Sequence, residues 1–283
     1  MRELLTRIER ASRLDRLADP IQQRVLSILQ PRRLRDALHG VWLGHPLHPA
    51  LVQVPIGAWT SVAVLDLLRG QRRAATILTG VGVGGALPAV VTGLNDWASL
   101  SPEQRRVGLV HAVANQIALV LYAGSFAARL TGRHNVGRAL AYLGFASASG
   151  GAYLGGHLAY KQAAGVNQAV PQLHLISDGW HPVADLSSLP EDQLVSRLID
   201  DVRVLVYRDG DDITVMLEHC PHQNGPLSEG SLTRIEGRAC VVCPWHGSTF
   251  ELANGEAVHG PAATDQQVLR SRVVDGRVEA QLP

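Results

Sequence analysis

The segments Cys220-Pro221-His222 and Cys243-Pro244-Trp245-His246 decide the fold of the last third of this 283-residue chain. Each segment offers one thiolate and one imidazole. Thiolates bind soft metals, and imidazoles suit zinc, copper and iron. Two Cys and two His are the donors of a structural zinc site. They are also the donors of a [2Fe–2S] centre in which two imidazoles replace two thiolates on one iron.

The residues around these donors favour the iron–sulfur centre. Cys220 opens the run CPHQNGPLSEG, and Cys243 opens the run CPWHGSTFEL. Over about residues 172–281 the chain therefore resembles the Rieske [2Fe–2S] domains of bacterial ferredoxins, oxygenases and nitrite reductase small subunits. The resemblance implies that Cys220 and Cys243 hold the inner iron. It implies that His222 and His246 hold the outer, more exposed iron.

Three positions separate this chain from the quinol-oxidising branch of the Rieske family. That branch has an additional Cys in each ligand loop, and the two form a disulfide; here Gly225 and Trp245 take their places. A Tyr that donates a hydrogen bond toward sulfur in that branch is Phe250 here, whereas the donor Ser248 is present. Because fewer hydrogen bonds to sulfur lower the reduction potential, we expect a low-potential, ferredoxin-like cluster.

Composition divides the chain into a basic and an acidic part. Residues 1–170 hold 18 Lys and Arg against 8 Asp and Glu, and residues 171–283 hold 8 against 17, so the parts carry +10 and −9. A basic part suits anionic lipid and an acidic domain suits a basic redox partner, although both could serve solubility alone. Three cysteines are too few for a disulfide framework. The one that is not a candidate ligand, Cys240, lies in an apolar run and is expected to be a buried strand residue.

Four apolar stretches of about 19–22 residues precede the Rieske-like part, at 50–68, 74–94, 107–128 and 139–160. Each is close to the ~20 residues that cross a bilayer as a helix. Gly and Ser crowd the second and fourth stretches, as they do in closely packed membrane helices. We therefore predict a multidomain protein, with an all-α four-helix transmembrane bundle at 40–162 and an all-β Rieske domain at 173–283.

The remaining segments are an N-terminal part at 1–39 and a linker at 163–172. The N-terminal part has apolar residues at helical spacing with Arg between them, which predicts an amphipathic helix. Such a helix could lie on the membrane surface or pack on the protein's own soluble domain. Ser101-Pro102 is typical of a helix start, and Asp209-Gly210-Asp211 of a hairpin turn.

Four histidines lie near the ends of the apolar stretches: His45, His48, His111 and His157. If the helices alternate across the bilayer, all four fall on the side of the Rieske domain. They could hold a b-type haem with one pair as axial ligands, bind copper, zinc or iron, line a quinone pocket, or serve only as interfacial caps. The run GHPLHP that begins at Gly44 resembles an uncharacterised family of four-helix bacterial membrane proteins, which implies the helix count but no activity.

These features predict a multi-pass protein of the cell inner membrane. The N-terminus has no secretory signal and no disulfide is expected, so we place the Rieske domain in the cytoplasm. The leading hypothesis is a membrane-anchored one-electron carrier, the electron-transfer component of an oxidoreductase system, with a reductase, an oxygenase or quinone as redox partner. We expect neither catalytic residues nor a nucleic-acid partner. The alternative is a non-catalytic redox or iron sensor whose helices anchor it or transduce a signal.

Overall fold

The computed structural model describes residues 2–283 and divides them into two compact units. The first unit runs up to Gln30 and resumes at Leu47–Ala164, and the second consists of Pro31–Pro46 and Gly165–Pro283. The first is helical and the second is rich in β-strands, which confirms the predicted order of an all-α and an all-β part. The division differs from the predicted boundaries, because Pro31–Pro46 belongs with the β-strands.

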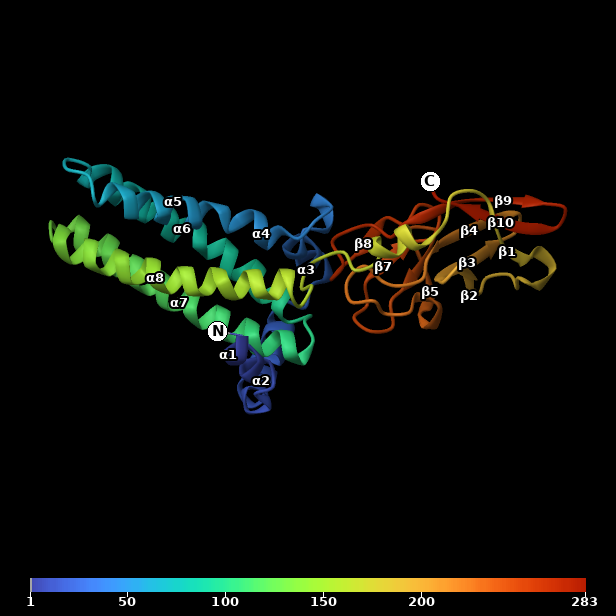
Figure 1. Cartoon of the computed structure of the whole chain (residues 1–283), viewed down its shortest axis with the longest axis horizontal. Helices are drawn as coiled ribbons and strands as arrows, with labels where there is room; N and C mark the ends of the chain where they lie inside the picture. The colour runs from blue at the N-terminus through green and yellow to red at the C-terminus, as the bar shows by residue number, and fades with distance from the viewer. Residues whose placement is uncertain (1) are drawn as a thin grey trace. The chain divides into compact units, whose positions relative to one another are not determined.

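Long helices build the first unit (Figure 1). They are α5 (Gln53–Leu65), preceded by the short α4 (Leu47–Leu51), then α6 (Arg72–Trp97), α7 (Pro102–Leu130) and α8 (His134–Tyr160). By length and composition, three segments of the described chain could cross a membrane: Leu47–Leu65, α6 and α7. The fourth predicted span is part of α8, which has 27 residues but is not among these three segments.

Small residues let these helices approach one another closely. A Cβ added to Gly82 of α6 would lie 2.2 Å from the indole nitrogen of Trp59, and one added to Gly144 of α8 would lie 2.9 Å from the ring of Tyr122. The two aromatic rings stack with their centroids 4.1 Å apart. Close contact at glycine is the usual packing device of membrane helices. The predicted start of α7 is confirmed, because Ser101 forms a capping box there.

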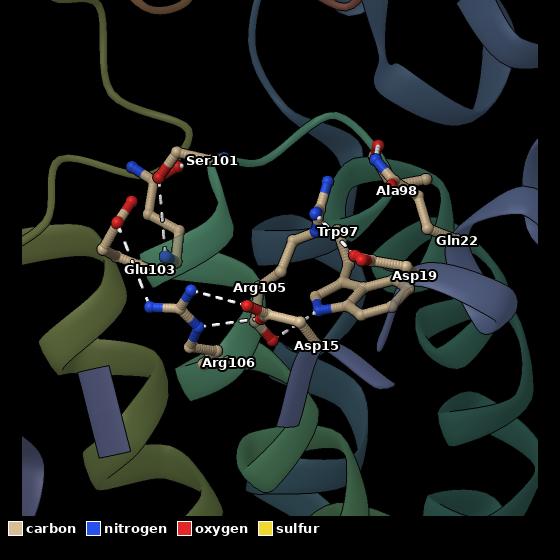
Figure 2. Close-up of polar contacts among 10 residues, drawn as sticks. Asp15, Asp19, Gln22, Trp97, Ala98, Ser101, Glu103, Arg105 and Arg106 are labelled. Atoms are coloured by element: carbon tan, nitrogen blue, oxygen red, sulfur yellow. Dashed lines mark hydrogen bonds and ion pairs between the residues drawn. The ribbon is translucent and has the colours of Figure 1, made fainter. Parts of the chain in front are cut away.

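The N-terminal helices α1 (Arg2–Glu9) and α2 (Asp15–Ile28) belong to the helical unit. The helix α2 packs where α6 ends and α7 begins (Figure 2). Arg106 of α7 donates to both carboxylate oxygens of Asp15, at 2.8 and 2.6 Å. Further contacts are the ion pair Arg105–Asp19 at 2.9 Å and the hydrogen bond from Gln22 to Ala98 at 2.7 Å. The helices α1 and α2 therefore belong to the helical unit, whereas the last part of the predicted N-terminal segment, Arg32–His39, belongs to the second unit.

Acid is expected to loosen this attachment. The hydrogen bonds from Arg106 hold the pKa of Asp15 below its usual range. A carboxylate with a lowered folded-state pKa stabilises the fold above its unfolded pKa, and this contribution is lost as the pH falls through the folded-state value. We expect the spin-label distance between α2 and α7 to stay constant from pH 8 to about 5 and to lengthen below about pH 4. Asp15→Asn should lengthen it at neutral pH and Glu103→Gln should not; lengthening of the wild type above pH 5 would contradict this account.

The second unit contains two antiparallel sheets, with strand orders β1-β10-β9-β4-β3-β2 and β5-β6-β7-β8. The strands are β1 (His181–Asp185), β2 (Leu194–Ile199), β3 (Val202–Asp209), β4 (Asp212–Leu217), β5 (Ser231–Ile235), β6 (Arg238–Val242), β7 (Thr249–Glu251), β8 (Ala257–His259), β9 (Val268–Val274) and β10 (Arg277–Gln281). The segment Pro31–Pro46 adds the helix α3 (Arg32–His39) to this unit.

Hairpin turns set the register of the strands that lead to the candidate site. Asp209 pairs with Asp212 across a two-residue turn, which confirms the predicted hairpin. Ile235 pairs with Arg238 across a second such turn, where both intervening residues have positive φ, as a type I′ turn requires. Cys240 of β6 is fully buried, as predicted.

Candidate metal centre

The first ligand loop follows β4. The backbone N–H of Cys220 donates to the carbonyl oxygen of Gly225, and the N–H of Asn224 donates to the carbonyl oxygen of Cys220, both at 2.9 Å. Asn224 has a φ of +58°, a left-handed conformation that Asn tolerates better than most residues. The chain therefore turns back on itself immediately after Cys220 and holds His222 within this turn.

The second ligand loop joins β6 to β7. The N–H of Cys243 donates to the carbonyl oxygen of Ser248 at 2.8 Å, and the N–H of Gly247 donates to the carbonyl oxygen of Cys243 at 3.1 Å. Gly247 has a φ of +76°, which glycine adopts without steric cost. In this loop the imidazole donor, His246, follows the thiol donor Cys243 by three residues. In the first loop His222 follows Cys220 by two residues.

The two loops bring the four predicted donors together. The thiols of Cys220 and Cys243 share a hydrogen bond. The rings of His222 and His246 meet edge to face, with their centroids 4.9 Å apart. Among residues 2–283, no three His, Cys, Asp or Glu side chains gather as ligands of a single ion. A pair of thiols and a pair of imidazoles instead fit a two-iron cluster, which takes two protein ligands on each iron.

The electrostatics of the site favour the deprotonated form of three of the four donors. The hydrogen bond from Cys220 lowers the pKa of Cys243 to about 6, whereas the same shared hydrogen bond and burial raise the pKa of Cys220. Burial, followed by the charges of His246 and His39, lowers the pKa of His222 to about 3. Burial also lowers the pKa of His246. Metal binding requires thiolate and neutral imidazole, and these shifts provide neutral imidazoles and one ready thiolate.

The surroundings of the sulfur atoms match the sequence interpretation. The hydroxyl of Ser248 hydrogen-bonds to the sulfur of Cys220 and accepts from the N–H of Ala262 at 3.0 Å. Phe250 is fully buried and has no hydroxyl to donate. A Cβ added to Gly225 would lie 2.7 Å from the sulfur of Cys243. This position therefore excludes side chains because the loop approaches the sulfur closely there.

The segment Pro31–Pro46 contributes to the site, which the sequence did not predict. The guanidinium of Arg32 donates to the carbonyl oxygen of Gly247 and to the hydroxyl of Thr249, both at 2.9 Å. Gly247 directly follows the candidate ligand His246. A residue that is more than 200 positions away in the sequence therefore fixes the second ligand loop, and no periodicity or spacing could have indicated it.

Two further residues of α3 contact the same unit. Asp36 accepts hydrogen bonds from the N–H of Gly260 at 3.0 Å and from Nδ1 of His259 at 2.8 Å. His39 is buried, and its charge interacts with that of His222. The only sequence signals were the breaks at Pro31 and Gly40, which separate this helix from its neighbours.

Replacing Arg32 by Ala is expected to lower the reduction potential of the centre. The substitution removes a positive charge and two hydrogen bonds from the loop that holds His246, and a positive charge stabilises the reduced, more negative state. Because Arg32 is exposed and therefore screened, we expect less than a tenfold change in the equilibrium constant, or less than about 59 mV for one electron. Protein-film voltammetry of the full chain measures the shift.

The exposed neighbour Arg33 provides the matched control, since Arg33→Ala removes the same charge one residue away. Arg32→Lys should retain most of the potential. Equal shifts for Arg32→Ala and Arg33→Ala would mean that only net charge, and not the contact with the loop, matters.

The four membrane-domain histidines have separate hydrogen-bond partners. Nδ1 of His45, in the second unit, lies 3.1 Å from the carbonyl oxygen of Pro46. The other three lie in the first unit: Nδ1 of His48 is 2.8 Å from the carbonyl oxygen of Ala89, Nδ1 of His111 is 2.8 Å from that of Gly151, and Nε2 of His157 is 2.8 Å from the carboxylate of Glu9.

Comparison with known proteins gives two family matches. Residues 179–271 match the Rieske [2Fe-2S] domain, and residues 44–168 match a family described as a predicted membrane protein (DUF2231). The anthranilate 1,2-dioxygenase ferredoxin subunit of Burkholderia cepacia is 31% identical over 100 residues, which are 35% of this chain and 89% of that protein.

Two further proteins each match about a third of the chain. The oxygenase component of dicamba O-demethylase from Stenotrophomonas maltophilia is 34% identical over 87 residues, which are 30% of this chain but only 24% of that protein. Among solved structures, the ferredoxin of carbazole 1,9a-dioxygenase from Nocardioides aromaticivorans aligns over 38% of this chain and 100% of its own, with 21% identity and a TM-score of 0.35.

Proposed function

Because the chain belongs to the Rieske [2Fe–2S] family, we propose that it is a membrane-anchored one-electron carrier with its cluster on Cys220, Cys243, His222 and His246. The observation that carries this proposal is the meeting of two thiols and two imidazoles at the ends of two tight loops. When bound there, a [2Fe–2S] cluster supplies one-electron oxidation and reduction.

The thiols and the imidazoles of the site differ in their exposure to solvent. Cys220 and Cys243 are buried, while the imidazoles of His222 and His246 are partly exposed, so electrons enter and leave on the imidazole side. Ser248 donates the side-chain hydrogen bond toward sulfur. With Phe250 in place of a hydroxyl donor, the potential is expected near the lower end of the Rieske range, about −150 mV.

The helical unit holds the carrier in the membrane. Three apolar segments of sufficient length and the match to a predicted membrane protein family support a multi-pass placement in the inner membrane. All three cysteines are free thiols, which suits a reducing compartment. We therefore place the Rieske domain in the cytoplasm.

The redox partner is proposed to be a reductase or an oxygenase protein, or quinone. A relative with 31% identity is the ferredoxin subunit of a dioxygenase, and such a subunit passes electrons between other proteins. The acidic charge of residues 171–283 suits a partner with a basic surface. The chain thus acts as one component of an oxidoreductase system.

A redox titration of the purified full chain tests this function. We expect a reversible wave with the slope of a one-electron couple, at a negative potential, in a preparation that holds iron and labile sulfide. A strongly positive potential would contradict assignment to the ferredoxin-like branch. Failure to take up an electron reversibly would contradict the carrier function.

A further inference from the structure

The helical unit contains the same arrangement twice, at His48 and at His111. Nδ1 of His48 lies 2.8 Å from the carbonyl oxygen of Ala89 in α6, and Nδ1 of His111 lies 2.8 Å from the carbonyl oxygen of Gly151 in α8. Because a carbonyl oxygen can only accept, Nδ1 carries the proton in both rings. Each neutral imidazole therefore keeps a lone pair on Nε2, the form in which His binds a metal.

A glycine lies against each ring, four residues after the accepting carbonyl. A Cβ added to Gly93 would lie 2.8 Å from Cε1 of His48, and a Cβ added to Gly155 would lie 3.1 Å from Cε1 of His111. The missing side chains are thus what allows each imidazole to reach the backbone of the neighbouring helix. The two histidines lie at the same level of the helical unit: Gly93, which lies against His48, is one turn before Trp97, and the Trp97 ring lies against Gly108, one turn before His111.

The other two predicted histidines lack this arrangement. Nε2 of His157 is already bonded to the carboxylate of Glu9 at 2.8 Å. His45 is exposed and bonds to the adjacent residue Pro46. Since no three His, Cys, Asp or Glu side chains among residues 2–283 gather around one point, a bare metal ion would lack the three or four protein ligands that it requires.

We propose that Nε2 of His48 and Nε2 of His111 are the two axial ligands of one b-type haem in the helical unit. A porphyrin supplies four nitrogen ligands itself, so the protein must supply only two. Hydrogen bonds from Nδ1 to backbone carbonyls are the outer-shell contacts that orient imidazole ligands. The Nδ2 atom of Asn115 lies 3.2 Å from Nε2 of His111, so haem binding would require this amide to turn away.

This inference rests on the proposed electron-carrier function and deepens it. A haem on these residues makes the helices an electron-transfer element, and not only an anchor. The haem and the cluster use separate residues in separate units, so each can be lost without the other.

Haem analysis of the full chain, expressed with a haem precursor and purified in detergent, tests the proposal. The pyridine haemochrome assay is expected to give one b-type haem per chain, with low-spin bands that shift on reduction. His48→Ala and His111→Ala should each lose the haem while the EPR signal of the reduced cluster remains. His157→Gln and His134→Ala are matched controls that should retain the haem. His111→Met keeps a possible ligand and should retain haem with altered bands, which guards against misfolding of the Ala variants.

Three results would overturn the proposal. The first is a preparation that holds the cluster but no haem, and that still takes up none when titrated with haemin. The second is haem retained in both His48→Ala and His111→Ala. The third is bound quinone in organic extracts of the wild type, absent from both variants, with no haem in either. Loss of the cluster signal from the wild type itself would instead contradict the proposed function.

Discussion

Cys243→Ser is expected to abolish the [2Fe–2S] centre of the full chain while the protein remains folded. The sulfur of Cys243 lies at the junction of the two ligand loops, 3% exposed and hydrogen-bonded to Cys220. A serine hydroxyl is a harder donor than a thiolate and stays protonated near neutral pH, so it replaces soft thiolate ligation poorly. Visible absorption, iron content and the EPR signal of the reduced protein should all fall to background.

Cys240 provides the control for this prediction. It is the third free cysteine, fully buried in β6, and its thiol donates to the backbone carbonyl of Arg238 at 3.5 Å. Cys240→Ser keeps a hydrogen-bond donor at that position and should retain the whole cluster. Retention of a cluster by Cys243→Ser, or its loss from Cys240→Ser alone, would show that the ligands are misassigned.

The second large effect is expected from Arg129→Ala, in the helical unit. Arg129 donates to both carboxylate oxygens of Asp66, at 2.9 and 2.5 Å, and their side chains are only 1% and 7% exposed. Its Nε also donates to Ser125 at 3.1 Å. Removing one partner of a buried pair leaves the other charge uncompensated, so we expect the free energy of unfolding to fall by about 3–5 kcal/mol.

Unfolding of the full chain in mixed detergent, followed by tryptophan fluorescence, measures this loss. Arg133→Ala removes an exposed arginine from the same turn and should change the free energy of unfolding by less than about 0.5 kcal/mol. The double variant Asp66→Asn/Arg129→Gln removes both charges and should be more stable than Arg129→Ala. If the single variant is as stable as the wild type, Arg129 and Asp66 are not a buried pair in the membrane.

The sequence was most informative where function depends on local spacing. The turn after Cys220 and the turn after Cys243 are formed from adjacent residues, so their donors could be found without a structure. The hairpin at Gly210 was predictable for the same reason. The order of an all-α part followed by an all-β part followed from the long apolar stretches and from the Rieske-like segments around Cys220 and Cys243.

The features that were missed depend on contacts between distant residues. Arg32 contacts Gly247 across more than 200 positions, and the break at Pro31 gave no sign of the partner. Likewise, the sequence placed four membrane-domain histidines on one side of the bilayer but did not indicate which pair could hold a haem. Only the carbonyl oxygens of Ala89 and Gly151 distinguish His48 and His111 from the other two.

The central claim is that this chain is a membrane-anchored protein with a Rieske cluster. Iron and acid-labile sulfide analysis of full-length protein purified from membranes, combined with nitrogen hyperfine couplings of its reduced EPR signal, tests it most directly. We predict two irons and two sulfides per chain, with hyperfine couplings from two imidazole nitrogens. His222→Ala and His246→Ala should each remove one of these couplings. One zinc per chain without sulfide, or an EPR signal without nitrogen couplings, would contradict the account.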